Sequence, residues 1–118
     1  MRIHRCPRCR AEDISADAHP TRALNNGRLV PLVVCRRCYR AADLELRIAC
    51  EAADVPLAPM PIREGLLLLS DFYLDRLAEQ DDPHLLVEDD ERRAAKVPIE
   101  AALDLVRRKL AIEPVRDV

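Results

Sequence analysis

The sequence predicts a small α+β fold in which a cysteine-rich part with a β-hairpin is followed by an α-helical segment. Three observations support this prediction. Two CxxC pairs lie 25 residues apart in a chain of 118 residues, and an Asn-Gly turn signal lies between them. After the second pair, apolar residues recur at helical spacing along most of the remaining sequence.

The two CxxC pairs predict a metal site. A CxxC turn directs both of its sulfurs to one point, so two turns supply four thiolates. Four thiolates form the tetrahedral shell that Zn²⁺ prefers, at Zn–S distances of about 2.3 Å. We therefore expect Zn²⁺ as the cofactor, with four ligands: Cys6, Cys9, Cys35 and Cys38.

Other interpretations of the cysteines have less support. Secreted disulfides would need an export signal, and no apolar segment precedes Cys6, so we expect a cytoplasmic protein. A redox CxxC normally follows a βαβ pattern, which is not apparent here. His4 could replace one thiolate as a ligand. Cys50 lies among alanines in an apparent helix, where a small buried side chain is the simplest interpretation.

The charge is divided unequally between the two parts. Residues 1–40 carry nine Arg against three acids, a net +6, whereas residues 41–118 carry ten Lys and Arg against eighteen acids, a net −8. A basic cysteine-rich part joined to an acidic helical part favours a polyanionic partner for the first and a protein partner for the second. No apolar run approaches the ~20 residues of a membrane span, so we expect no membrane partner.

A hairpin is predicted between the cysteine pairs. Asn25-Asn26-Gly27 separates two short semi-apolar runs, and Asn and Gly both tolerate the positive φ of a tight turn. Pro31 has no backbone N–H, so we expect it to limit how far the second strand pairs.

A helix is predicted from Tyr39 to Ala53, directly after the second cysteine pair. Its expected core stripe consists of Ala41, Leu44, Ile48 and Ala52. The order of knuckle, hairpin, knuckle and helix over residues 5–53 resembles the treble-clef class of zinc fingers. The helix N-terminus would place free N–H groups near the thiolates.

The chain is thereby divided into three segments: a four-cysteine zinc finger with its helix at 1–53, a Pro-rich linker at 54–62, and a helical C-terminal region at 63–118. In the last region, a helix is predicted from Arg63 or Gly65 to about Gln80. Its stripe of Leu66, Leu69, Tyr73 and Leu77 is widened by Leu67 and Leu74.

Two further elements are predicted near the C-terminus. Asp82-Pro83 is typical of a cap and first residue of a helical segment, although Leu85-Leu86-Val87 could form a short strand instead. The last helix is predicted to begin at Pro98 and to stop at Pro114. Its inner face would consist of Ile99, Ala102, Leu103, Val106 and Leu110.

No catalytic constellation is apparent, but residues 6–42 faintly resemble the HNH nucleases, which often place their motif on a treble clef. The resemblance implies that His19 is the general base and that Asn26 orients it. An alanine separates Asp17 from His19, and Tyr39 occupies the position of the family's last His, which would remove a ligand of the catalytic metal. We therefore predict that the protein is not an enzyme.

Three functions remain open. The first is a non-enzymatic zinc-binding regulator or adaptor. Its helical part would bind protein or self-associate, and its basic finger would contact duplex DNA or structured RNA. The arginines expected to make that contact are Arg5, Arg8, Arg10, Arg36, Arg37 and Arg40. The second is a purely protein-binding zinc module, such as an inhibitor of a larger enzyme encoded by a phage or mobile element. The third is a degenerate HNH-type nuclease.

Overall fold

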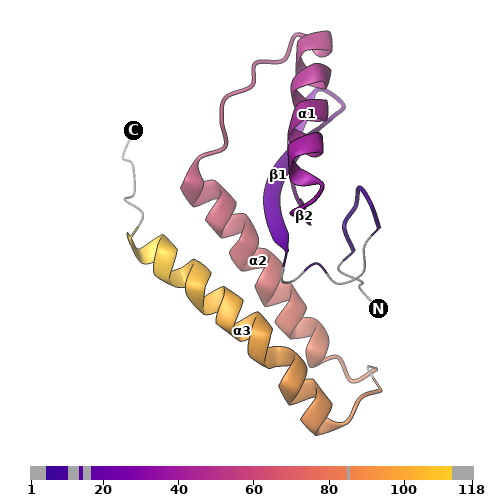
Figure 1. The fold of residues 1–118 in the computed structure, drawn as a ribbon, viewed down its shortest axis with the longest axis vertical. Coiled ribbons are helices and arrows are strands. Elements are labelled where there is room, and N and C mark those ends of the chain that lie inside the picture. Colours follow the sequence, from indigo (N-terminus) through magenta and orange to yellow (C-terminus); the bar gives the residue numbers. More distant parts are fainter. Residues whose placement is uncertain (1–4, 11–13, 15–16, 85, 113–118) are drawn as a thin grey trace.

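The computed structural model describes residues 5–10, 14, 17–84 and 86–112. Its elements follow the order β1 (Ala18–Asn25), β2 (Arg28–Cys35), α1 (Tyr39–Ala53), α2 (Ile62–Gln80) and α3 (Asp89–Ile112). The fold is a small α+β arrangement of one antiparallel hairpin and three helices, in which α2 and α3 lie side by side and run in opposite directions (Figure 1).

The hairpin turns at the Asn-Gly signal, as predicted. Asn26 and Gly27 have φ values of 52° and 76°, the positive values that a type I′ turn requires at both central positions. The strands then pair without interruption from Asn25↔Arg28 to Ala18↔Cys35.

The expectation that Pro31 would limit pairing was wrong, and the register explains why. Pairs in an antiparallel ladder alternate between hydrogen-bonded and non-hydrogen-bonded positions, starting from the bonded pair at the turn. Counted from Asn25↔Arg28, the pairs of Pro31 with Arg22 and of Pro20 with Val33 both occupy non-hydrogen-bonded positions. The missing N–H of each proline therefore removes no ladder bond.

The hairpin lies between α1 and α2. Thr21 and Pro20 are neighbours on β1, so their side chains point to opposite faces. Thr21 is buried and donates from Oγ1 to Oδ1 of Asp43 on α1, at 2.6 Å. Pro20 faces Gly65 of α2, where an added Cβ would lie 3.2 Å from the proline Cγ.

Helix α1 has the predicted bounds but not the predicted buried face. Leu44 and Ile48 are 51% and 58% exposed, whereas Leu46 and Cys50, on the opposite side, are buried. The bond between Thr21 and Asp43 turns the side of the helix that carries Leu46 toward the hairpin. The buried position of Cys50 confirms the interpretation of that residue as a small core side chain.

Helix α2 lies close to its predicted bounds and follows an irregular segment. Asp54, at φ 55°, ends α1 in the left-handed conformation, and residues 55–61 contain no helix or strand. Helix α2 begins at Ile62, slightly before the predicted start, and ends at Gln80. Leu66 and Tyr73 are buried as predicted, but Leu67 and Leu74 are largely exposed and do not widen the buried stripe.

The start of α3 differs from the prediction. No helix begins at Asp82-Pro83, because Asp82 instead accepts a hydrogen bond from the backbone N–H of His84 within a turn. Leu86 and Val87 form no strand, and Leu85 lies outside the described residues. Helix α3 begins at Asp89, so Pro98 lies inside it.

The early start of α3 has an electrostatic reason. Its first turn contains Asp89, Asp90 and Glu91, which complement the positive end of the helix dipole. The predicted inner residues Ile99, Leu103 and Val106 are buried, and the helix ends at Ile112. Pro114, the predicted stop, lies outside the described residues.

Two clusters of buried residues hold the molecule together. One surrounds the cysteines, and the other lies between α2 and α3. Phe72 of α2 packs against both clusters, so the cysteine-rich part and the helical part share a contact.

Candidate metal centre

The first knuckle is a tight turn at the N-terminal end of the described chain. The backbone N–H of Arg10 donates to the carbonyl of Cys6 at 2.9 Å, and Arg10 has a φ of 65°. This turn brings Cys6 and Cys9 to one side. Cys6 is fully buried and Cys9 is exposed, so the cluster reaches the surface at Cys9.

The second knuckle joins β2 to α1. Cys35 is the last residue of β2, and Cys38 is the N-cap of α1. The N–H of Cys38 donates to the carbonyl of Cys35 at 3.0 Å, and the carbonyl of Cys38 accepts from the N–H of Ala42 at 2.8 Å. The knuckle is therefore fixed at one end by the sheet and at the other by the first turn of the helix.

The four predicted ligands come together in the structure. The Sγ atoms of Cys6, Cys9, Cys35 and Cys38 all lie within 4.8 Å of one another, and those of Cys9 and Cys35 are 3.6 Å apart. Four thiolates around one ion at about 2.3 Å would have sulfurs about 3.8 Å apart. All four cysteines are free of disulfides, so this cluster can hold a metal ion.

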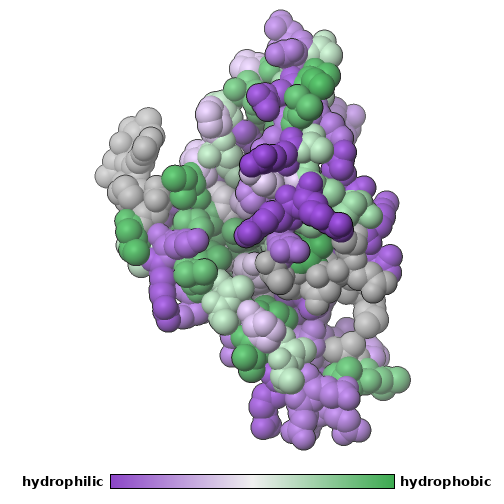
Figure 2. Space-filling model, viewed as in Figure 1, coloured by the Kyte–Doolittle hydropathy of each residue, from purple (hydrophilic) through white to green (hydrophobic). Residues whose placement is uncertain are grey.

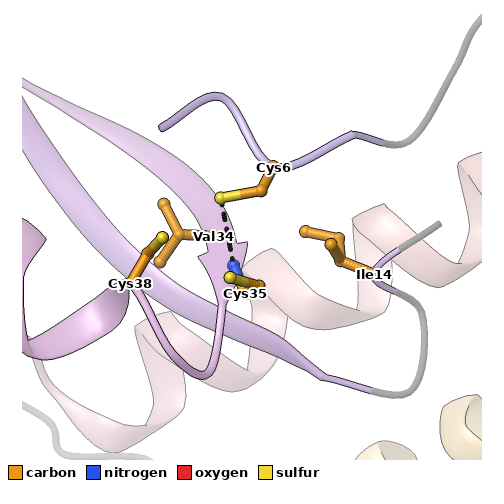
Figure 3. Close-up of a cluster of buried hydrophobic side chains, with 5 residues drawn as sticks. All are labelled: Cys6, Ile14, Val34, Cys35 and Cys38. Atoms are coloured by element: carbon orange, nitrogen blue, oxygen red, sulfur yellow. Dashed lines mark hydrogen bonds between the residues drawn. The ribbon is translucent and has the colours of Figure 1, made fainter. Parts of the chain in front are cut away.

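The register of the hairpin supplies a hydrogen bond to the cluster. Cys35 pairs with Ala18 at a non-hydrogen-bonded position, so its N–H points away from β1. That N–H donates to Sγ of Cys6 at 3.4 Å, and Figure 3 shows the bond beside Cys38, Val34 and Ile14. The bond favours the thiolate form of Cys6, which is the form that binds metals.

The cysteines differ in how readily they ionise. Burial acts to raise the pKa of Cys6, but backbone hydrogen bonds from Cys35, Cys9 and Arg8 outweigh it and lower the pKa to about 6. At Cys38 the bond from Arg8 acts to lower the pKa, but burial and the neighbouring thiols raise it to about 11. A cluster of four close thiols cannot readily hold four negative charges unless a cation is bound among them.

Arg8 connects the first knuckle to α1. Its Nη1 lies 3.7 Å from Sγ of Cys38, and its Nη2 and Nε donate to Oε1 of Glu45 at 2.8 and 3.1 Å. The hydrogen bond from Arg8 lowers the pKa of Glu45, against the opposing effect of desolvation. Sequence reasoning assigned Arg8 to nucleic acid and missed Glu45, whose only signal was its acidic charge near the second knuckle.

The other arginines of the predicted basic surface have different surroundings. Arg36 and Arg37 project from the second knuckle and are exposed. Arg40, in the first turn of α1, donates to the hydroxyl of Tyr39 at 3.4 Å. Arg10 is exposed beside the first knuckle, and Arg5 lies near Asp71 and Asp75 of α2 around a shallow hollow.

The two residues of the HNH resemblance are not brought together. Asn26 is in the hairpin turn, and His19 pairs with Val34 near the other end of the hairpin. Six strand residues separate them, which at about 3.3 Å per residue amounts to roughly 20 Å. His19 instead stacks on Tyr39, with ring centroids 3.9 Å apart.

Comparisons with known proteins yield no matching protein family, curated protein or solved structure. Within the described part of the chain, none of the helices combines the length and apolar character needed to cross a membrane. The cysteine cluster is therefore the feature of the molecule that is most informative about function.

Proposed function

We propose that the protein is a non-enzymatic zinc-binding regulator or adaptor, with a treble-clef-like finger that presents a basic surface to nucleic acid. The observation that carries the proposal is the convergence of four cysteine sulfurs within 4.8 Å, from one knuckle before the hairpin and one after it. Soft thiolate ligands in a tetrahedral set select Zn²⁺ over the harder divalent cations.

The ligand set supports a structural role for the ion. A shell of four protein thiolates leaves no position open for water or substrate, whereas catalytic zinc sites keep one. The ion would join the first knuckle to the junction of β2 and α1. The finger would thereby gain the stability that its few buried side chains cannot supply.

Exposed arginines at the second knuckle support a nucleic-acid contact. Arg36 and Arg37 lie between the ligands Cys35 and Cys38, and Arg40 follows in the first turn of α1. Arginine guanidinium groups bind phosphate oxygens through paired hydrogen bonds and release counterions from the polyanion. Arg8 contributes less, because Glu45 already neutralises its charge.

The salt dependence of binding tests this proposal. The zinc-loaded protein should bind duplex DNA or structured RNA at low salt, and each phosphate contact should contribute about 0.9 to the log–log slope on duplex DNA. Changing Arg36, Arg37 and Arg40 together to Ala should lower that slope by up to about three and leave zinc bound. Fluorescence anisotropy at several salt concentrations measures the slope.

A matched control distinguishes this surface from general positive charge. Three exposed cations of α3, Arg93, Arg107 and Lys109, can be changed to Ala in the same way. These changes should leave the slope unaltered. The proposal fails if both triple variants lose the same affinity, or if the intact protein binds neither duplex DNA nor structured RNA at low salt.

A purely protein-binding module is the second candidate, and the exposed side of α1 favours it. Leu44 and Ile48 lie one turn apart with about half of each side chain exposed. In the view of Figure 2, hydrophobic residues are exposed among hydrophilic ones at several places on the surface. Exposed apolar positions of this kind are common in protein interfaces. Retention of a protein partner by the triple Arg variant, and its loss on changing Leu44 and Ile48 to Ser, would support this candidate.

A further inference from the structure

A cavity of about 570 Å³ lies between β1, α1, the linker and the first turns of α2, on the side of α1 away from Leu44 and Ile48. Its walls are mostly apolar, and the apolar residues come from three consecutive segments of the chain. Leu46 belongs to α1, Leu57 and Met60 to the linker, and Leu66 and Leu69 to α2. The volume falls within the range of about 300–1,000 Å³ that is typical of small-molecule sites.

Local features of the sequence keep this cavity open. Arg22 donates from Nη2 to the carbonyl of Ala58 at 2.7 Å, which holds the linker across the space. Pro59 and Pro61 stiffen the linker on either side of Met60. Gly65 lets α2 approach Pro20 closely, so that the helix closes one end of the cavity.

Positive side chains outnumber negative ones around the cavity. Asp43 accepts the hydroxyl hydrogen bond of Thr21, and Arg22 donates to the neutral carbonyl of Ala58. Arg47 lines the cavity one turn after Asp43 and has no ion pair or hydrogen bond with any described residue. Two guanidinium groups therefore face one carboxylate, which leaves positive charge beside an apolar wall.

We propose that this cavity binds a small apolar molecule that carries one carboxylate. The apolar body of the ligand lies against Leu46, Leu57 and Leu66, where it is removed from water. Its carboxylate accepts hydrogen bonds from Arg47, whose guanidinium matches carboxylate geometry in a bidentate pair. The site is independent of the basic second knuckle and of the cysteine cluster.

Two ligand sources share this chemistry, an aliphatic acid and an aromatic acid, and the experiment includes both. The full-length zinc-loaded protein is titrated with decanoate and with 2-naphthoate, and with decanol and decylamine as controls of the same chain length. Two-dimensional ¹H–¹⁵N NMR gives the dissociation constants. The chain has two glycines: Gly65 lines the cavity, and Gly27 lies in the hairpin turn.

The expected result is a saturable shift of the Gly65 amide with an acid, and none of the Gly27 amide. Arg47→Gln should weaken binding of the acid about tenfold or more, because it removes a charge-assisted hydrogen bond. Arg107→Gln on α3 is the matched control and should bind as the wild type does. Leu57→Trp should block the cavity and abolish the Gly65 shift, with zinc content as the check of folding.

The acid with the lower dissociation constant shows whether the ligand is an aliphatic or an aromatic acid. The proposal is overturned if neither acid shifts the Gly65 amide. It is also overturned if decanol or decylamine binds as tightly as decanoate, or if Arg47→Gln binds as tightly as Arg107→Gln. None of these outcomes bears on nucleic-acid binding, so this proposal and the proposed function can fail separately.

Discussion

The cysteine-rich part and the α2–α3 pair have buried clusters of different composition. The buried cluster of the first consists of Ile14, Val34 and three of the four candidate ligands, Cys6, Cys35 and Cys38. The cluster of the second consists of Leu66, Tyr73, Ile99, Leu103 and Val106, none of them a candidate ligand. With a metal ion bound as proposed, one short chain would combine two sources of stability, metal coordination in one part and apolar burial in the other.

Removal of one candidate metal ligand should unfold the cysteine-rich part and leave the α2–α3 pair folded. Cys35→Ser should eliminate metal binding and unfold the hairpin with its knuckles, because structural zinc contributes an apparent ~10–16 kcal/mol to folding. Helix α2 should remain helical against α3. Native mass spectrometry measures the metal, and NMR of the methyl groups reports on each cluster.

Cys50→Ala is the control for this variant. Cys50 is buried in α1 away from the four clustered sulfurs, so the change should leave one ion per chain. A Cys35→Ser protein that stays folded without metal would contradict the difference between the two parts.

Truncation of a buried apolar side chain between α2 and α3 should destabilise the helical pair and leave metal binding intact. Leu103→Ala should reduce the free energy of unfolding by about 2–5 kcal/mol, because the side chain is buried between α2 and α3 and would leave a cavity. Zinc content should not change. Urea unfolding followed by circular dichroism provides the measurement.

The neighbouring Leu105 offers a matched control, since it lies on the same helix and is 51% exposed. Leu105→Ala should change the free energy of unfolding by much less than Leu103→Ala. Loss of zinc in the Leu103 variant would show that the two parts do not have separate sources of stability.

The smallest expected effect concerns the ion pair between Arg8 and Glu45, next to the cysteine cluster. Glu45→Gln should leave the metal bound but speed its transfer to a chromogenic chelator, because Arg8 would lose the charge that holds it beside Cys38. High salt should reduce the difference, since both side chains are exposed. Glu51→Gln, on the exposed side of α1, should transfer zinc at the wild-type rate.

The pH dependence of this contact has a definite sign. Arg8 holds the pKa of Glu45 below its ordinary value of 4.5. A carboxyl group with a lowered pKa in the folded state stabilises that state above its ordinary pKa, and the contribution is lost as the pH falls through the lowered value. The contribution is therefore fully present at pH 7, where the chelator experiment is performed.

The sequence predicted those features that depend on local spacing. The two CxxC pairs identified the four clustered cysteines, and Asn26-Gly27 located the turn, because each signal is contained within a few residues. The bounds of α1 followed from the continuous helical pattern after Cys38.

Features that depend on tertiary contacts were not predicted. Helix α1 has apolar residues on both sides, and the bond between Thr21 and Asp43 accompanies burial of the side that carries Leu46 and Cys50. Pro98 fits the first turn of a helix as a local signal, but the acidic turn at Asp89 begins the helix earlier. Glu45 could not be assigned to Arg8, since the two lie 37 positions apart in the chain.

The positions of Pro20 and Pro31 have a consequence for association between chains. In a two-stranded ladder, residues at non-hydrogen-bonded positions direct their N–H groups outward, toward the free edge of their own strand. One proline on each strand therefore interrupts the row of outward donors on each edge of the hairpin. A strand from another molecule would meet a missing donor on either side, which discourages edge-to-edge growth into larger sheets.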